Sequence, residues 1–161
     1  MLAVVVALLI LLANLAKQAK SQPNNALSTN IHPLAVLTEG VLYKNASGTL
    51  ERTRIAEEIY RAERLVGRYG GSCVQFVRWF TGNSQIKGTA KNLGTNSKTP
   101  QIGGVVKTRE SYLGHTAVIL YIQDEQIFIV ESNYGWDNKI GIRWLNINNP
   151  LIEGYLLGGD L

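Results

Sequence analysis

The chain has 161 residues, of which 45% are hydrophobic and 17% are charged. This length and composition suit one folded domain with a packed core, and they exclude a wholly disordered chain. Sixteen Lys and Arg against twelve Asp and Glu give a formal charge of +4, without the blocks of basic residues that are typical of nucleic-acid binding. The single cysteine, Cys73, excludes an intramolecular disulfide scaffold, and beside only two histidines it leaves nucleophilic catalysis open.

The first sixteen residues are almost uniformly apolar. A helix of about sixteen residues spans roughly 24 Å, which is short for a bilayer core about 30 Å thick and long enough for the apolar part of a signal peptide. No basic side chain precedes the apolar run, whereas Lys17 and Lys20 follow it, so its topology stays open. We expect residues 1–16 to be a signal peptide or a membrane anchor, and the protein to be exported to the cell envelope, anchored or secreted.

The next segment, residues 17–50, starts with a stretch rich in Asn, Ser and Gln, which indicates a tether and a lead-in to the folded domain. His32 lies in this tether, and we expect no chemistry from it. The domain itself is expected over residues 51–161.

The domain is predicted to begin with helices and to end with strands. Apolar residues recur at three- and four-residue steps over residues 54–69, and glycines end this helix before a second one over 72–80. Residues 82–101, rich in Gly, Ser, Asn and Thr, are predicted to form a long loop. Asp124-Glu125 is predicted to be a tight hairpin turn. This order predicts an α+β domain with an antiparallel sheet, whose strands are expected at 103–107, 116–122, 126–132, 140–145 and 151–157.

A candidate nucleophile opens the second predicted helix. Cys73 follows Gly70-Gly71-Ser72, and these glycines allow a sharp turn and the close approach of a substrate. A helix N-terminus offers unpaired N–H groups and the positive end of the helix dipole, and both favour a thiolate. The alternative is a small core residue, because Cys73 shares one helical face with Phe76 and Phe80.

A candidate base and a candidate acid follow. His115 stands where a loop enters an apolar strand, which is a rigid mount for a general base, although a histidine bonded to a backbone carbonyl is the alternative. Glu131 shares a strand face with Ile127 and Ile129, so it is expected to be partly buried and to need a partner. The hairpin makes His115 that partner, with a bulge or a diagonal pairing to bring the two into register. Nucleophile, base and orienting group are the arrangement of thiol hydrolases.

Four motifs occur in a familiar order: GGSCVQFVRWF (70–80), IGGVV (102–106), GHTAVILYI (114–122) and IFIVESNYG (127–135). Together they resemble the CHAP domain, the cysteine, histidine-dependent amidohydrolase/peptidase family, over most of the chain from about residue 54 to 157. The resemblance implies a papain-like α+β fold of the NlpC/P60 type, with N-terminal helices packed on an antiparallel sheet. It also implies hydrolysis of amide bonds in bacterial cell-wall peptidoglycan. An NlpC/P60-like peptidase is the alternative within the same reaction class, and Glu131-Ser132-Asn133 favours the CHAP family.

The resemblance assigns roles to four residues. Cys73 is implied to be the nucleophile and His115 the general base. Glu131 is implied to orient the imidazole, and Asn133, in the Glu-x-Asn pattern, to complete the site.

Two aromatic residues follow this pattern. Tyr134 and Trp136 are expected to bind substrate, with a core or hairpin-corner position as the alternative for Trp136. The sequence departs from the family at Gly104, where a Gly-Asp-Val motif is usual. Some members bind calcium through acidic residues before the cysteine, but residues 64–72 contain no carboxylate. No metal and no cofactor is therefore expected.

The sequence thus predicts a peptidoglycan hydrolase that acts by a Cys–His–Glu thiol mechanism, either an N-acetylmuramoyl-L-alanine amidase or an endopeptidase. Peptidoglycan is the expected substrate, the membrane is the expected partner of residues 1–16, and nucleic acid is not expected to bind. The sequence leaves assembly partners undefined. The alternative is a catalytically silent, membrane-tethered module of the same fold that binds or assembles the cell wall.

Overall fold

The structure is a computed structural model that describes the backbone of residues 46–158 and the side chains of residues 54–158. The expected signal peptide or anchor at residues 1–16 lies outside the described residues, as does the tether up to residue 45. Within the described part, no helix combines the length and the apolar character that crossing a membrane requires.

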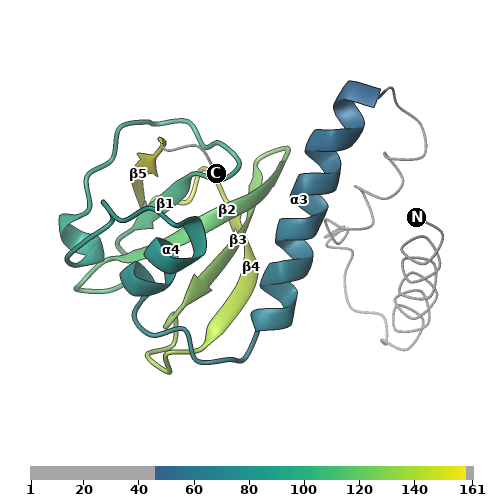
Figure 1. Ribbon diagram of the computed structural model, residues 1–161. Coiled ribbons are helices and arrows are strands. Elements are labelled where there is room, and N and C mark those ends of the chain that lie inside the picture. Colours follow the sequence, from purple (N-terminus) through teal and green to yellow (C-terminus); the bar gives the residue numbers. More distant parts are fainter. Residues whose placement is uncertain (1–45, 159–161) are drawn as a thin grey trace, which may run out of the picture. The chain divides into compact units, whose positions relative to one another are not determined.

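Within the described residues, α3 and α4 precede the sheet (Figure 1). Helix α3 spans Ala46–Leu65 and helix α4 spans Cys73–Thr81. The predicted start of α3 at residue 54 was wrong, because residues 46–53 carry too few apolar residues to show the helical period. The helix therefore crosses the expected domain boundary between residues 50 and 51. It ends at Leu65, where the chain turns through Gly67 (φ +78°), whose N–H donates to the carbonyl oxygen of Ile140 at 2.8 Å.

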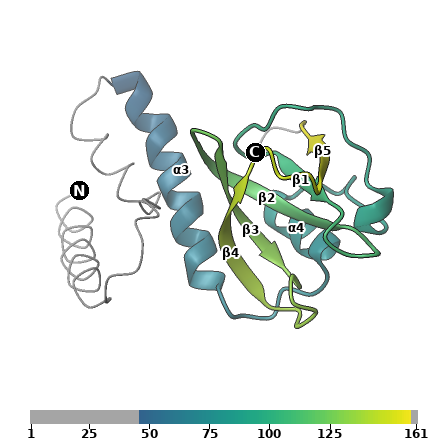
Figure 2. The ribbon, with the colours of Figure 1, turned by 180° about the vertical axis from the view of Figure 1, so that it is seen from behind.

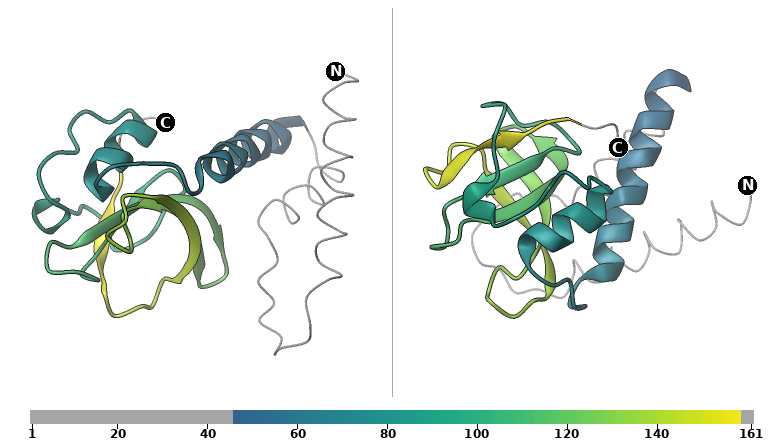
Figure 3. Two further views of the ribbon diagram at one scale, coloured as in Figure 1. Left: turned by 90° about the horizontal axis from the view of Figure 1, so that it is seen from below. Right: turned by 60° about the vertical axis from the view of Figure 1, so that its left-hand side comes forward.

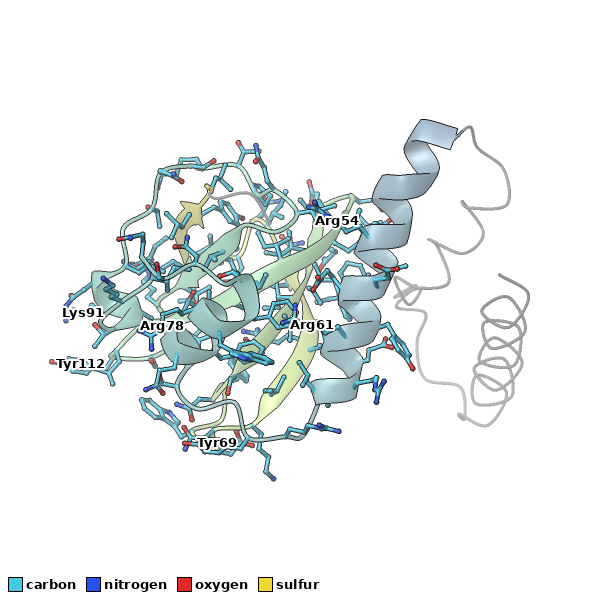
Figure 4. All side chains as sticks on the ribbon, viewed as in Figure 1. Arg54, Arg61, Tyr69, Arg78, Lys91 and Tyr112 are labelled. Carbon is cyan, nitrogen blue, oxygen red and sulfur yellow. The ribbon has the colours of Figure 1, made fainter. Side chains whose placement is uncertain are left out.

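The two helices are joined by an aromatic contact. The guanidinium carbon of Arg61 on α3 lies 4.4 Å from the ring centre of Phe80 and 5.5 Å from that of Trp79, both on α4. Figure 4 shows Arg61 reaching from α3 toward α4. Such cation–π contacts stabilise a pairing by about 0.5–2 kcal/mol, so this one helps to fix α4 beside α3.

A five-stranded antiparallel sheet follows, with the strand order β4-β3-β2-β1-β5. The predicted turn at Asp124-Glu125 is confirmed, because Gln123 of β2 pairs with Gln126 of β3 across it. The five predicted strands are also confirmed, with ends that differ by at most two residues. Their bounds are β1 Val105–Thr108, β2 His115–Gln123, β3 Gln126–Ser132, β4 Ile140–Asn146 and β5 Ile152–Leu156.

Both faces of the sheet are buried. Val118 and Val130 lie on the face that packs against the helices, in a cluster with Phe76 of α4. Ile119 and Ile129 lie on the other face, in a second cluster of strand side chains. Figure 2 and Figure 3 show the helices on one side of a curved sheet. The chain therefore forms the predicted α+β domain, with helices packed on an antiparallel sheet.

Candidate active site

Cys73 is the first residue of α4, and a capping box fixes the start of this helix. The Ser72 hydroxyl accepts a hydrogen bond from the Gln75 N–H at 3.4 Å, and the Gln75 side chain accepts one from the Ser72 N–H at 3.2 Å. The N–H of Cys73, at the first helical position, has no partner within the helix. Cys73 is half-buried: it packs against the core and also lines a pocket, and its role as the nucleophile stays a prediction.

The turn before Cys73 is docked on the end of β3. Gly71 adopts φ +72°, and its carbonyl oxygen accepts a 2.8 Å hydrogen bond from the buried Ser132 hydroxyl. A Cβ atom at Gly70 would lie 2.5 Å from the Ser132 Oγ and 2.6 Å from a side-chain carbon of Ile140. The two glycines are therefore needed for the conformation and the close packing of this turn.

His115 is the first residue of β2 and is 5% exposed. Its Nε2 lies 2.9 Å from Oε2 of Glu131. Ala117 is the residue directly paired with Glu131, so His115 contacts Glu131 along the diagonal, as the sequence predicted. Because Nε2 is engaged by Glu131, Nδ1 is the ring nitrogen that remains for Cys73, which lines the same pocket as His115.

The environment of His115 favours its charged form. Burial lowers the pKa of His115, but hydrogen bonds with Cys73 and Glu131, together with attraction to their negative charge, outweigh burial and raise the pKa to about 9. At neutral pH the imidazole is therefore protonated and lies between a sulfur atom and a carboxylate. A buried charge of this kind is stable only when it is paired, as it is here.

Glu131 is 3% exposed and is held by a residue that the sequence analysis missed. Arg143 Nε donates to Oε1 of Glu131 at 2.7 Å, and Arg143 Nη2 lies 3.2 Å from Oε2. Burial raises the pKa of Glu131, but the hydrogen bonds from His115 and Arg143 outweigh it, so the pKa is lowered from its ordinary value. The signal for Arg143 is a lone charged residue inside the apolar strand Ile140–Asn146.

Arg143 has further partners. Its Nη2 lies 2.8 Å from Oε2 of Glu110, and the buried Thr108 hydroxyl donates to the same oxygen at 2.9 Å. The guanidinium carbon lies 4.0 Å from the ring centre of Tyr134. The Tyr134 ring also meets His115 edge-on, with ring centres 5.7 Å apart. Tyr134 thus covers two residues of the site.

A pocket of about 380 Å³ opens at this point. Its lining includes Cys73, His115, Asn133, Tyr134 and Trp136, and Glu131 lies behind His115. The structure therefore brings all the candidate residues to one place.

The two remaining candidates lie in the loop after β3. The Asn133 side-chain oxygen accepts a hydrogen bond from the Asn138 N–H at 3.0 Å, so this side chain closes the loop, and a role in the reaction stays a prediction. Trp136 is 64% exposed and has φ +62°. Among the residues that the structure describes, no group of three or more His, Cys, Asp or Glu side chains is arranged to hold a metal ion.

Part of the chain that carries this site matches a family model. Residues 64–133 match the family model described as CHAP domain. No curated protein matches the chain.

The fold resembles that of solved structures. One is described as "The crystal structure of Ly7917 with the hydrolyzing product of MDP": identity is 16%, the TM-score is 0.51, and the match covers 63% of this chain and 61% of that one. "The crystal structure of Ly7917" matches at 16% identity with a TM-score of 0.49, over 63% of this chain and 60% of that one. "X-ray Crystal Structure of PlyC" matches at 15% identity with a TM-score of 0.47, over 86% of this chain and 43% of that one.

The chain thus spans about three fifths of the length of the Ly7917 chains that it matches. The family match covers Cys73, His115 and Glu131. Residues 64–133 therefore resemble the CHAP domain, and the chain has the papain-like α+β fold that its sequence predicted.

Proposed function

We propose that this protein is a peptidoglycan hydrolase that cleaves amide bonds with Cys73 as the nucleophile. The observation that carries the proposal is the contact series from Cys73 through His115 to Glu131, which lies at a pocket in a CHAP domain. Support for the substrate class comes from the family resemblance, and a solved structure of this fold is described with the hydrolyzing product of MDP.

The proposed reaction begins with transfer of the Cys73 thiol proton to His115, which gives a thiolate beside an imidazolium. The Cys73 sulfur attacks the carbonyl carbon of a substrate amide, and the carbonyl oxygen becomes an oxyanion next to the Cys73 N–H, which at the helix start has no partner within the helix. His115 then gives its proton to the leaving nitrogen, the C–N bond breaks, and a thioester to Cys73 remains. A donor such as this N–H lowers the barrier by about 2.7–4 kcal/mol in comparable sites.

Water completes the cycle. His115, now neutral, takes a proton from a water molecule, whose oxygen attacks the thioester carbon. The C–S bond breaks, a carboxylic acid is released, and Cys73 and His115 return to the thiolate and imidazolium forms. Glu131 accepts a hydrogen bond from Nε2 throughout, so it keeps Nδ1 aimed at the reacting atoms.

The proposal includes two alternatives for the peptidoglycan bond that is cut. An N-acetylmuramoyl-L-alanine amidase and an endopeptidase would use the same three residues, so both bonds remain alternatives within the proposal. The proposed place of action is the cell envelope, where peptidoglycan lies, and export and membrane attachment are assigned to residues 1–16, outside the described residues.

The test uses purified peptidoglycan and the full chain, as wild type and as Cys73→Ala, with Ser84→Ala as an exposed control substitution. Released fragments are identified by mass spectrometry. We expect fragments from the wild type and the control but none from Cys73→Ala, and the fragment masses distinguish sugar–peptide cleavage from peptide cross-bridge cleavage. Folded wild-type protein that sediments with peptidoglycan but releases nothing from several wall types would overturn the proposal in favour of a wall-binding module.

A further inference from the structure

Behind His115, three charged side chains from three segments form one hydrogen-bonded group. Glu131 comes from β3, Arg143 from β4, and Glu110 from the loop between β1 and β2. Arg143 contacts Glu131 at 2.7 and 3.2 Å and Glu110 at 2.8 Å. The carboxylate side chains are 3% and 10% exposed and the arginine is 25% exposed, so water screens these contacts little.

The geometry fixes the plane of the Glu131 carboxylate. Two nitrogens of the Arg143 guanidinium contact the two oxygens of Glu131, and a planar fork of this kind allows one orientation. In this orientation Oε2 faces Nε2 of His115 at 2.9 Å. The Tyr134 ring covers the guanidinium at 4.0 Å and limits its movement.

Glu110 adds a second carboxylate to the charged groups around His115. The groups that face this part of the site are Cys73 from α4, Glu131 from β3, Arg143 from β4 and Glu110 from the β1–β2 loop, with the Tyr134 ring above. Arg143 alone would neutralise Glu131 and weaken its attraction for an imidazolium. Glu110 shares Nη2 of Arg143 with Glu131, so a net negative charge remains for the imidazolium.

We propose that Arg143 and Glu110 are positioning residues for the catalytic pair: Arg143 orients Glu131 toward His115, and Glu110 offsets the charge of Arg143 so that the imidazole keeps its proton. The proposal rests on the proposed function only in taking Cys73 and His115 as the reacting pair. Arg143 does not line the pocket, whereas Glu110 lies at its edge, and both are proposed to act on His115 through Glu131. Their contribution is therefore to the charge and orientation of His115.

The test measures the titration of His115 in the full chain by NMR of its ring nitrogens, with His32, the other histidine of the sequence, as an internal reference. The variants are Glu110→Gln, Arg143→Gln and Arg143→Lys. Two exposed residues serve as charge-matched controls: Glu125→Gln in the β2–β3 turn and Arg78→Gln on α4 (Figure 4). A second readout is the rate of Cys73 alkylation against pH, which is unambiguous because Cys73 is the only cysteine.

Opposite shifts are expected. Glu110→Gln removes a negative charge and lowers the His115 midpoint by about one pH unit, whereas Arg143→Gln raises it by about one pH unit. Arg143→Lys keeps the charge but loses the fork, so the midpoint stays near that of the wild type while hydrolysis slows by about tenfold. Equal or same-direction shifts in the two Gln variants, or control shifts as large, would overturn the proposal.

Two further results separate this inference from the proposed hydrolase activity. Opposite shifts of the His115 midpoint in a protein that releases no peptidoglycan fragments support the charge arrangement and remove the hydrolase function. If hydrolysis depends on Cys73 but the His115 midpoint does not move in the variants, the hydrolase function is supported and the charge arrangement is overturned. If Arg143→Gln does not fold by circular dichroism, the midpoint of Glu110→Gln and the rate of Arg143→Lys decide: an unmoved midpoint or a wild-type rate counts against the inference.

Discussion

The Ser132 hydroxyl donates a 2.8 Å hydrogen bond to the carbonyl oxygen of Gly71, and this bond joins the end of β3 to the turn that precedes α4. Glu131 is the neighbour of Ser132 on the strand, and Cys73 lies two residues after Gly71. The bond thus ties the backbone that carries the acid to the backbone that carries the nucleophile. Such a constraint matters because catalytic groups must be held to within about 0.5 Å of the productive geometry.

Ser132→Ala is expected to lower the free energy of unfolding by about 1–2 kcal/mol, because it leaves the Gly71 carbonyl without its buried donor. The hydrolysis rate is expected to fall severalfold, since the start of α4 is no longer fixed to β3. Chemical denaturation and fragment release measure the two effects. Ser84→Ala, at an exposed position, is the matched control. Wild-type stability in Ser132→Ala would mean that the bond does not hold the turn.

Gly114→Ala tests whether the tight packing of Gly114 holds His115, the next residue, in position. Gly114 has φ +72°, and a Cβ atom there would lie 2.8 Å from the Lys91 backbone nitrogen. Gly82 also has a positive φ, +68°, but a Cβ atom there meets nothing within 4 Å. In both variants an alanine must adopt a left-handed backbone conformation, which costs about 1–2 kcal/mol. Gly114→Ala also places a methyl group against the backbone of Lys91. We expect Gly114→Ala to lose at least about 1 kcal/mol more stability than Gly82→Ala in denaturant titrations, and to lose activity.

Equal losses in the two Ala variants would show that the loop relaxes around the new methyl group. In that case the position of His115 would depend on its contacts with Glu131 rather than on the packing of Gly114 beneath the short 3-10 helix η1, Ala90–Asn92.

The sequence predicted the part of the site that depends on local pattern. The burial of the Glu131 side chain and its need for a partner were predictable, because the strand alternates with period two and places this carboxylate in a row of apolar residues. The hairpin then predicted that His115 is the partner of Glu131. The contact between them is diagonal because Ala117, not His115, pairs directly with Glu131. Counting residues from the turn places the two side chains near each other but does not determine this register.

The rest depends on pairings that residue patterns do not encode. Arg143 reaches Glu131 only because β4 pairs with β3 in a register that sets Gly141 opposite Glu131. Glu110 comes from a different loop, between β1 and β2, and its distance from Arg143 is set by tertiary packing. The first residues of α3 were missed for another reason: they lack apolar periodicity and are helical nonetheless.

The pH dependence of stability follows from His115. Its pKa is raised from 6.5 to about 9 in the folded protein, so the folded state holds this proton more tightly than the unfolded chain does. The resulting stabilisation is complete below about pH 6.5 and is lost as the pH rises through about 9. We expect the free energy of unfolding to fall by about 1–3 kcal/mol across this range. The hydrolysis rate should fall above about pH 9, because the imidazole no longer supplies a proton to the leaving nitrogen.

Urea denaturation between pH 6 and pH 10 measures this dependence. His115→Gln is expected to flatten it, while His32→Gln, in the predicted tether, leaves it unchanged. A slope that persists in His115→Gln would assign the titration to another group.

Trp136 is the last candidate residue, and its backbone supports a role in binding. It is 64% exposed and has φ +62°, a conformation that costs a non-glycine residue about 1–3 kcal/mol. Stability gains little from an exposed ring in a strained backbone at the lining of the pocket, which favours contact with substrate. Trp136→Ala is therefore expected to weaken binding to peptidoglycan by about tenfold, seen in KM rather than kcat, with stability unchanged within about 0.5 kcal/mol. Tyr69→Ala is the control, because Tyr69 is an aromatic residue that is 80% exposed and does not line this pocket; equal effects of the two substitutions on KM would assign the loss to general surface hydrophobicity instead.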